Sequence, residues 1–296
     1  MHLIHNYSKN VEPIRIDIFL AFIPPLSLPL PVMIKNTIRH VAHSLGYRIS
    51  KISELSEPVI YPFIDVLDLV VRDFSQTKPD LFFMQVGSHD GSFADPIHHL
   101  VKQHHWRGIL VEPQPLAFQQ LVQNYQEESQ LIFENAIISQ QVGTTKFYIV
   151  RQPEGVELPP WLEQSASLDR QKLVGALFHW KVIEKHPGIP DDFESLIEEV
   201  ILPTATVESL LKKHQVQQLD LLIIDTMGHD FEIIRSLPFD RIKPAVIHFE
   251  HSLLSSRDRN DCLDYLQGQG YKLAKVAVDT IAYLHAPVRH WTVEEW

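Results

Sequence analysis

Two glycines followed at a distance by a carboxylate form the most informative pattern in this chain of 296 residues. Gly87 and Gly91 come directly after the apolar run 81–86, where they permit a tight turn and let a ligand approach the backbone closely. Glu112 ends a second apolar run, 108–112, and lies 21 positions after Gly91. An acidic side chain about 20 residues beyond such a turn is typical of a site that binds ribose hydroxyls. The spacing therefore predicts a nucleoside site.

A second group of polar residues ends or follows two later apolar runs, and its residue types suit proton transfer or metal binding. Its members are Asp225, His229, Asp230, Glu250 and His251. Histidine titrates near neutral pH and suits a general base, so His229 and His251 are candidate catalytic residues; the alternative is that each is a hydrogen-bonded structural residue. Oxygen and imidazole ligands also suit Mg²⁺ or Mn²⁺, but no compact ligand motif is present, and a metal is not favoured.

Short apolar runs alternate with helical patterns along the chain, which is typical of a parallel α/β sheet. The expected strands are 81–86, 108–112, 131–138, 219–225, 245–250, 271–276 and 280–284, with an edge strand at 146–150. The expected helices are 58–74, 95–105, 115–125, 206–214, 231–237 and 258–268. Asp95 is the predicted N-cap of the second helix. The carboxyl ends of parallel strands share one sheet edge. We expect the glycine turn with Glu112 and the polar group that includes Asp225 to lie together at this edge.

The last two expected strands distinguish this sheet from a nicotinamide-binding one. Only three residues separate 271–276 from 280–284, so the pair is predicted to be an antiparallel hairpin. A nicotinamide-binding Rossmann sheet stays parallel to its sixth strand, and its turn carries a third glycine. Both differences argue against a nicotinamide-dependent oxidoreductase, which we keep as an alternative.

Residues 151–203 interrupt the alternation with six prolines among short apolar patches. We expect an irregular or helical insertion that determines substrate specificity. Its aromatic residues either line an acceptor pocket or simply pack together. They are Trp161, Phe178, His179 and Trp180.

Composition narrows the class of protein further. The net charge is −11, with no basic cluster of the kind that grips phosphate backbones, so nucleic acid is not an expected partner. The single cysteine, Cys262, excludes an intramolecular disulfide and a cysteine-based zinc site, and it fits the cytoplasm. We expect Cys262 to be a small core residue.

The N-terminal region has no clear leader or membrane span. Residues 14–34 are apolar but carry four prolines within eight positions, which prevents a membrane helix. We expect residues 1–32 to be a poorly structured extension before a natural start at Met33. Residues 33–80 are predicted to be a helical segment that either caps the sheet or pairs two subunits into a homodimer, and 81–296 to be the main domain.

Several further histidines have plainer interpretations. The pairs at 98–99 and 104–105 lie on the expected helix 95–105 beside charged and amide side chains, so a solvated helix face is predicted. His248 alternates with Glu250 along its strand and is predicted to pack against a helix.

The motifs and their order resemble the FkbM family of S-adenosylmethionine-dependent methyltransferases, from about residue 80 to the C-terminus. The matching segments are 86–91, 111–115 with Leu121 and Asn124, 135–137, 219–225 leading to Gly228, and 247–251. The resemblance implies a Rossmann-like class I α/β fold. That fold is a three-layer sandwich whose mostly parallel seven-stranded sheet ends in a C-terminal antiparallel hairpin. The implied cofactor is S-adenosylmethionine, and the implied reaction is O-methylation of a hydroxyl on a small molecule or glycan.

Carried over position by position, the resemblance implies a role for each motif residue. The glycine turn passes under the methionine part of the cofactor, Glu112 takes the ribose hydroxyls, and Asp225 faces the reaction centre. Asn135 and Ala136 border the adenine. The expected cofactor-binding residues are Gln85, Gly87, Ser88, Asp90, Gly91, Glu112, Pro113, Asn135, Ala136 and Asp225.

Two positions depart from the family pattern. Gln85 stands where many methyltransferases carry an acid, which removes charge assistance from a hydrogen bond to the cofactor's ammonium group. Met227 stands where the family has glutamate, which removes a carboxylate beside the expected active centre. These departures favour a second alternative, in which a degenerate methyltransferase fold binds without turnover.

Overall fold

The computed structural model describes most of the chain after residue 79. The described residues are 80–93, 95–151, 165–183 and 189–284, with Leu67, Val70, Val71, Ser75, Lys78, Leu158, Leu162, Lys185 and His186. The chain divides after Phe63, and all described residues belong to the second unit. The predictions for residues 1–32, for Met33 and for Trp161 lie outside the described residues. In the part of the chain that is described, no helix is long and apolar enough to cross a membrane.

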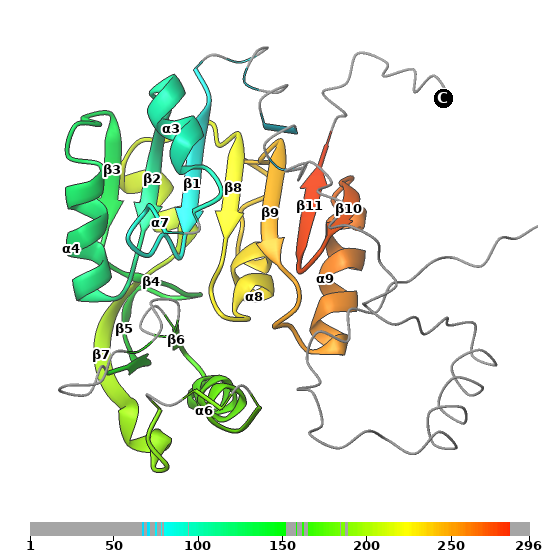
Figure 1. Cartoon of the computed structure of the whole chain (residues 1–296). Helices are drawn as coiled ribbons and strands as arrows, with labels where there is room; N and C mark the ends of the chain where they lie inside the picture. The colour runs from blue at the N-terminus through cyan, green and yellow to red at the C-terminus, as the bar shows by residue number, and fades with distance from the viewer. Residues whose placement is uncertain are drawn as a thin grey trace, which may run out of the picture. The chain divides into compact units, whose positions relative to one another are not determined.

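Seven strands form the main sheet, in the spatial order β10-β11-β9-β8-β1-β2-β3 (Figure 1). Their bounds are β1 (Phe82–Val86), β2 (Arg107–Val111), β3 (Leu131–Glu134), β8 (Leu221–Ile224), β9 (Val246–Glu250), β10 (Lys272–Val276) and β11 (Asp279–Tyr283). The five strands from β9 to β3 are parallel, whereas β11 pairs antiparallel with both β9 and β10. The predicted hairpin is confirmed, and the sheet differs from the fully parallel nicotinamide-binding one.

Helices cover both faces of the main sheet and make a three-layer sandwich, which confirms the predicted Rossmann-like α/β fold. They are α3 (His98–His104), α4 (Pro115–Asn124), α7 (Val207–Lys213), α8 (Asp230–Arg235) and α9 (Ser256–Gly268). Alternate residues of β1 point to opposite faces. Met84 and Val86 pack with α7, α8 and α9, whereas Phe83 packs with α3 and α4. Cys262 is fully buried in the first of these cores, as predicted.

Four more strands form a second sheet, in the order β4-β7-β5-β6. Their bounds are β4 (Ile137–Ile138), β5 (Gly143–Val150), β6 (Ala166–Ser167) and β7 (Ile197–Ala205). Two predictions were wrong here: strand 131–138 is split between the two sheets, and 146–150 belongs to an interior strand of the second sheet. An apolar run indicates a strand, but its partner is chosen by packing against residues far away in the sequence.

The insertion 151–203 has more regular structure than its prolines indicate. Helix α6 (Arg170–Phe178) leads into a π-helical turn, η2 (His179–Ile183), and a 3-10 turn, η3 (Phe193–Leu196), precedes β7. The insertion and β5 share an apolar core of their own. Its buried members are Val150, Leu158, Leu162, Leu173, Leu177, Ile189 and Leu196. In Figure 1, α6 and the second sheet lie beneath the carboxyl ends of the main strands.

Helix α3 begins at His98, three residues later than the predicted start at Asp95. The N-cap is Ile97, so the prediction that Asp95 is the N-cap was wrong. Asp95 Oδ1 nevertheless accepts hydrogen bonds from the N–H groups of Ile97 (2.8 Å) and His98 (3.0 Å) just before the helix.

Two leucines of α4 test how the fold depends on the face that α3 and α4 cover. Leu121 is fully buried there, whereas Leu116 on the same helix is 75% exposed. We expect Leu121→Ala to lower the free energy of unfolding by about 2–5 kcal/mol, because it leaves a cavity. Leu116→Ala, the matched control, should change it by less than about 0.5 kcal/mol. Urea denaturation measures the free energy of unfolding of both variants, and equal changes would contradict the burial of Leu121 against the main sheet.

Candidate functional site

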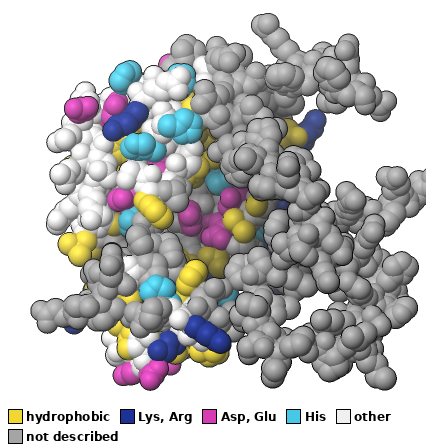
Figure 2. Space-filling model, in the orientation of Figure 1, with side chains coloured by type: hydrophobic (Ala, Val, Ile, Leu, Met, Phe, Trp, Pro, Cys, Tyr) yellow, Lys and Arg dark blue, Asp and Glu magenta, His cyan; other side chains and the backbone are white. Residues whose placement is uncertain are grey.

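The polar residues that were singled out meet at one edge of the main sheet. Glu112 follows β2, Asp225 follows β8 and Glu250 ends β9. Asp279 begins β11, which runs in the opposite direction and therefore starts at the same edge, opposite Glu250. Acidic side chains gather near the middle of the face shown in Figure 2. The carboxyl edge is therefore the candidate site, as predicted.

The turn after β1 lies against the end of β8. Gly87 has φ +83°, and a Cβ there would lie 1.8 Å from the carbonyl oxygen of Asp225, so no other residue fits. The N–H groups of Gly87 and Ser88 both donate to the carbonyl of Val111, at 3.0 and 3.1 Å. Backbone bonds therefore hold the turn beside Glu112.

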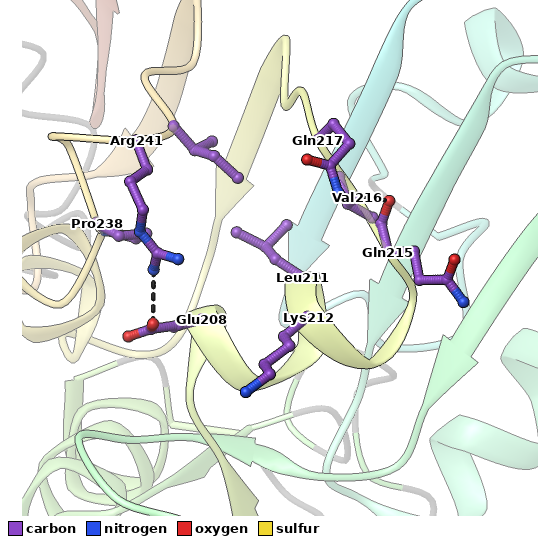
Figure 3. Close-up of a pocket in the computed structure, with 9 residues that line it drawn as sticks. Glu208, Leu211, Lys212, Gln215, Val216, Gln217, Pro238 and Arg241 are labelled. Atoms are coloured by element: carbon purple, nitrogen blue, oxygen red, sulfur yellow. Dashed lines mark hydrogen bonds and ion pairs between the residues drawn. The ribbon is translucent and has the colours of Figure 1, made fainter.

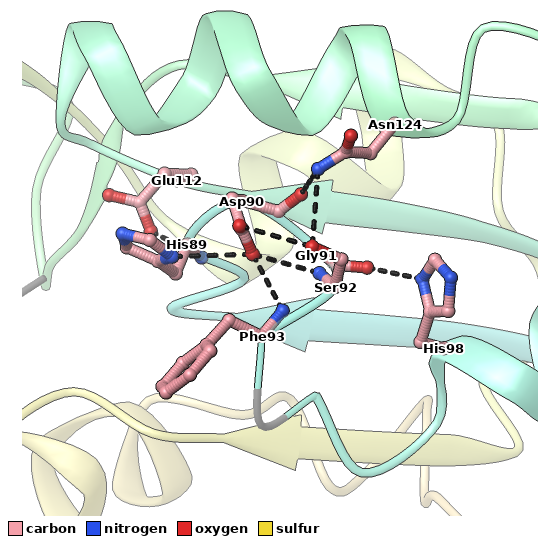
Figure 4. Close-up of polar contacts among 8 residues, drawn as sticks. All are labelled: His89, Asp90, Gly91, Ser92, Phe93, His98, Glu112 and Asn124. Atoms are coloured by element: carbon pink, nitrogen blue, oxygen red, sulfur yellow. Dashed lines mark hydrogen bonds and ion pairs between the residues drawn. The ribbon is translucent and has the colours of Figure 1, made fainter. Parts of the chain in front are cut away.

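Glu112 is buried with its carboxylate directed at this turn (Figure 4). Oε2 accepts the N–H of His89 and Oε1 accepts the N–H of Gln114, each at 2.8 Å. Burial raises the pKa of Glu112 to about 7, and the nearby Asp225 carboxylate adds to the shift. Each carboxylate oxygen keeps a further lone pair, so hydroxyl groups of a ligand can still be accepted.

Asp90 shapes the turn through its side chain. Oδ1 accepts the N–H groups of Ser92 and Phe93, both at 2.9 Å, and Oδ2 accepts the Ser92 hydroxyl at 3.1 Å. Desolvation opposes ionisation here, but these hydrogen bonds hold the pKa of Asp90 below its usual value. The Asp90 carbonyl accepts Asn124 Nδ2 at 2.8 Å, which ties the turn to α4 (Figure 4).

His98 was predicted to belong to a solvated helix face, and that prediction was wrong. Its ring nitrogen hydrogen-bonds to the carbonyl of Gly91, and its ring lies 5.1 Å from that of Tyr125 (Figure 4). The start of α3 comes close to the turn, a contact that helical spacing does not reveal. His99, His104 and His105 are exposed, as predicted.

The other predicted cofactor residues lie at the same edge. Asn135 Nδ2 donates to the carbonyls of Glu112 (2.7 Å) and Pro113 (3.0 Å), so it fastens the end of β3 to that of β2. Ala136 is buried, and the Ser88 hydroxyl donates to the Gln85 carbonyl at 3.2 Å. These contacts position the backbone around Glu112.

Asp225 is exposed at the end of β8, and its N–H donates to the Val86 carbonyl at 3.0 Å. Protein atoms around the carboxylate desolvate it, and Asp279 repels its charge, so the pKa of Asp225 is raised, against an opposing effect of His248. His248 Nε2 lies 3.6 Å from Asp279 Oδ2 on β11. The structure therefore brings His248 to the candidate site, which the sequence did not predict.

Asp230 lies beneath this loop and is fully buried. Its Oδ2 accepts the Thr226 hydroxyl at 3.0 Å and the Gly228 N–H at 3.2 Å, while Oδ1 has no partner among the described residues. Burial raises the pKa of Asp230 to about 7, and the charges of Asp225 and Glu250 add to it. Asp230 is thus a largely neutral support for the loop near pH 6.

The two histidines predicted to be catalytic have different surroundings. His229 is half-buried at the start of α8, and burial lowers its pKa, as does Lys172, against an opposing effect of Glu232. His251 is buried and its Nδ1 lies 3.0 Å from the Thr280 hydroxyl. Of the two, only His229 lies in the loop that contains Asp225.

No group of three or more His, Cys, Asp or Glu side chains among the described residues is arranged to hold a metal ion. The candidate set around Asp225 and Glu250 is thus a cluster of charges at a sheet edge. Mutual repulsion raises the pKa values of its members beyond the effect of burial.

Lys172 is a residue of this region that sequence analysis missed. Its Nζ reaches from α6 to the carbonyls of Gly228 (3.0 Å) and Leu253 (3.4 Å), which follow β8 and β9. Met227 has φ +53° and packs against the apolar core of the insertion. Because the partners of Lys172 are carbonyls, no sequence motif marks this contact, which ties the insertion to the candidate site.

Two aromatic residues of the insertion differ in how far they are buried. Trp180 is partly buried against the insertion's core, and Phe178 is exposed with its ring edge toward Phe193.

A pocket of about 260 Å³ lies elsewhere, between α7 and the segment 238–242 (Figure 3). Its lining residues are Glu208, Leu211, Lys212, Gln215, Val216, Gln217, Pro238, Arg241 and Ile242. An ion pair between Arg241 and Glu208, at 2.6 Å, crosses one side. The end of α7 leads to the amino end of β8, so this pocket is at the opposite edge of the sheet.

Asp230 provides a test of the electrostatics at the site. The pKa of this carboxyl is 3.8 in the unfolded chain and about 7 in the folded protein. As pH rises between these values, the carboxyl ionises more readily in the unfolded chain, which lowers the free energy of unfolding by up to about 4 kcal/mol. Asp230→Asn removes this ionisation and keeps one oxygen for Thr226. We expect its free energy of unfolding to exceed that of the wild type increasingly from pH 4 to 7. Urea denaturation measures this, with exposed Asp240→Asn as control; a constant difference across pH would contradict the expectation.

Comparison with known proteins agrees with the fold and the motif residues. The family model of the methyltransferase FkbM domain matches residues 85–273, which is more than half of the chain. A search of curated proteins found no match.

Solved structures with a similar fold include several methyltransferases. The METTL16 MTase domain has a TM-score of 0.39 at 9% identity, covering 87% of this chain and 83% of that one. A putative caffeoyl-CoA O-methyltransferase from Staphylococcus aureus has a TM-score of 0.39 at 10% identity, with 85% and 99% covered. Precorrin-6y C5,15-methyltransferase from Geobacter metallireducens has a TM-score of 0.35 at 11% identity, with 78% and 92% covered. Since these scores are below 0.5, the family match and the motif residues carry the assignment. The chain belongs to the FkbM family of methyltransferases, whose class I fold implies the use of S-adenosylmethionine.

Proposed function

We propose that this methyltransferase transfers the methyl group of S-adenosylmethionine to a hydroxyl oxygen of a small molecule or glycan. The observation that carries the proposal is the accessible Asp225 carboxylate among other acids at the carboxyl edge. A base of this kind is what a hydroxyl acceptor needs, because it must lose its proton as the new bond forms.

The residues of the edge fit the cofactor. S-adenosylmethionine supplies an electrophilic methyl group on a sulfonium, and the molecule also carries an ammonium group. Positive charge is favoured beside the carboxylates of Glu112, Asp225, Glu250 and Asp279. Gly87, where the Asp225 carbonyl leaves no room for a side chain, brings the turn close to the end of β8.

Glu112 has the geometry of a ribose-binding residue. Two backbone N–H groups fix its carboxylate, so its remaining lone pairs have set directions for the two ribose hydroxyls. We expect Glu112→Gln to weaken the binding of S-adenosylhomocysteine by about tenfold or more, because one acceptor oxygen is lost. Calorimetry measures the affinity, with exposed Glu208→Gln as the matched control. Equal affinities of wild type and Glu112→Gln would contradict this role.

Asp225 is the group that we assign to removing the proton of the acceptor hydroxyl. It is exposed, follows the central strand β8, and has a raised pKa, which brings its basicity closer to neutral pH. His229, four residues further on, is the second candidate, since its lowered pKa keeps the ring neutral and able to accept a proton.

The insertion flanks the place where the acceptor would bind. Lys172 ties it to the loops after β8 and β9, and Phe93 and Leu253 present apolar surface close to the same edge. Apolar groups beside carboxylates suit an acceptor that has both a ring or carbon skeleton and hydroxyls. A single buried cysteine is consistent with a cytoplasmic location.

Methyl transfer from labelled S-adenosylmethionine to a panel of sugars and hydroxylated small molecules tests the function. We expect Asp225→Asn to lower kcat by about 10²–10⁴-fold at saturating S-adenosylmethionine. In the wild type, kcat should fall as pH decreases through the raised pKa of Asp225, and this dependence should disappear in the variant.

Full activity of Asp225→Asn would assign the base elsewhere. Binding of S-adenosylhomocysteine without transfer to any acceptor would instead favour a binding module without turnover. Met227 supports this second candidate, because it packs against the insertion where the family pattern has a glutamate. Gain of transfer by Met227→Glu would identify that position as the cause.

A further inference from the structure

Three buried oxygen atoms beside the glycine turn have no hydrogen-bond partner among the described residues. They are Oε1 of Gln85, a residue only 4% exposed, Oδ2 of Asp95 and the hydroxyl of Tyr125, whose ring lies against Gly91. A buried polar atom without a partner costs about 1–3 kcal/mol, so such atoms are rare in native structures. Two of them in neighbouring side chains indicate a site that a hydrogen-bond donor completes.

The two side chains form a connected pair. The Gln85 side chain lies close enough to the Asp95 carboxyl to favour its charged form. The other carboxyl oxygen, Oδ1, accepts the N–H groups of Ile97 and His98. The backbone at the start of α3 therefore fixes the orientation of Asp95 and leaves Oδ2 for a ligand.

The pair lies close to the glycine turn. Gln85 is in β1, two residues before Gly87, on the strand face that α3 and α4 cover, as the packing of Phe83 shows. His98, three residues after Asp95, bonds to the carbonyl of Gly91. Glu112 accepts the N–H of His89 in the same turn. The carboxyl groups of Asp95 and Glu112 are therefore both near the turn.

The charge of Asp95 has little compensation in the described part of the chain. His98 is the one ionisable group there that stabilises the charged form, and burial opposes it. The Tyr125 hydroxyl lies close enough for the Asp95 charge to raise its pKa. A cation bound at Oδ2 would supply the missing charge compensation.

We propose that Asp95 and Gln85 form the subsite for the ammonium group of the methionine moiety of S-adenosylmethionine. An ammonium has three N–H donors and no acceptor, which matches two partnerless acceptor oxygens. The carboxylate ten residues downstream thus supplies the charge that Gln85 does not carry at the end of β1. This inference rests on the proposed function, because it takes S-adenosylmethionine as the ligand.

Calorimetry with a pair of ligands tests the subsite. The pair is S-adenosylhomocysteine and its analogue that lacks only the α-amino group. We expect the wild type to bind S-adenosylhomocysteine about 10–100-fold more tightly than the analogue, as a charge-assisted hydrogen bond predicts. Asp95→Asn should abolish this preference and bind the analogue as the wild type does. Asp264→Asn, an exposed aspartate on α9, is the matched control and should keep the preference.

The variant is designed to keep the fold. Asparagine keeps an acceptor oxygen at this position, so the bonds to Ile97 and His98 can persist, and thermal unfolding checks this. Adding Gln85→Glu to Asp95→Asn returns a carboxylate to the subsite, and we expect the preference to return. Absence of this rescue would overturn the role of charge.

The outcomes separate the two proposals. Retention of the preference in folded Asp95→Asn overturns the subsite. Equal affinities of the wild type for both ligands also overturn it, and this measurement needs no variant. If the wild type binds neither ligand, the proposed function fails, and the subsite fails with it.

Discussion

The candidate site depends on the short distance between the ends of strands β1 and β8. A side chain at Gly87 would collide with the Asp225 carbonyl, so β1 and β8 can end together only because that position is glycine with φ +83°. The left-handed conformation turns the chain toward β2, where two N–H groups bond to Val111. His89 N–H then reaches Glu112. One steric constraint thereby positions the turn, the Glu112 carboxylate and the proposed base relative to one another.

Electrostatic repulsion is the second property of this edge. Glu112, Asp225, Asp230 and Glu250 all have raised pKa values, because each is desolvated and lies near other carboxylates. Such an arrangement destabilises the empty protein at neutral pH and is relieved when a cation binds. This repulsion is consistent with the proposal that the edge binds a positively charged ligand. Hydrogen bonds from backbone N–H groups orient the carboxyl groups of Glu112 and Asp230.

The insertion adds a second core that is fastened to the first at few points. Lys172 bonds to backbone carbonyls after β8 and β9, and Met227 packs into the apolar cluster of the insertion. Met227 adopts φ +53°, which is uncommon for a residue with a side chain. Packing in the insertion offsets that strain. The loop that contains His229 is therefore shaped jointly by the sheet and by the insertion.

The predicted strands of the main sheet agree with the observed ones to within one or two residues, except 131–138. The runs of the parallel strands are mostly apolar over a strand's length and end at a polar or glycine residue, which is local information. The second sheet was missed because the pairing of β5 with β7 joins residues more than 40 positions apart. His98 was misassigned for a related reason: its partner, Gly91, belongs to a turn outside the helix.

The sequence alone was enough to predict the order of strands and helices along the chain, the glycine turn and the distant carboxylate, because these depend on neighbouring residues and fixed spacings. It also determined the terminal hairpin, through the short connection between its strands. Only the tertiary structure decided which polar groups have partners. The pairing of Gln85 with Asp95 and the burial of His251 and Asp230 depend on how helices pack against the sheet. Packing of that kind joins side chains by distance in space, which spacing along the chain does not encode.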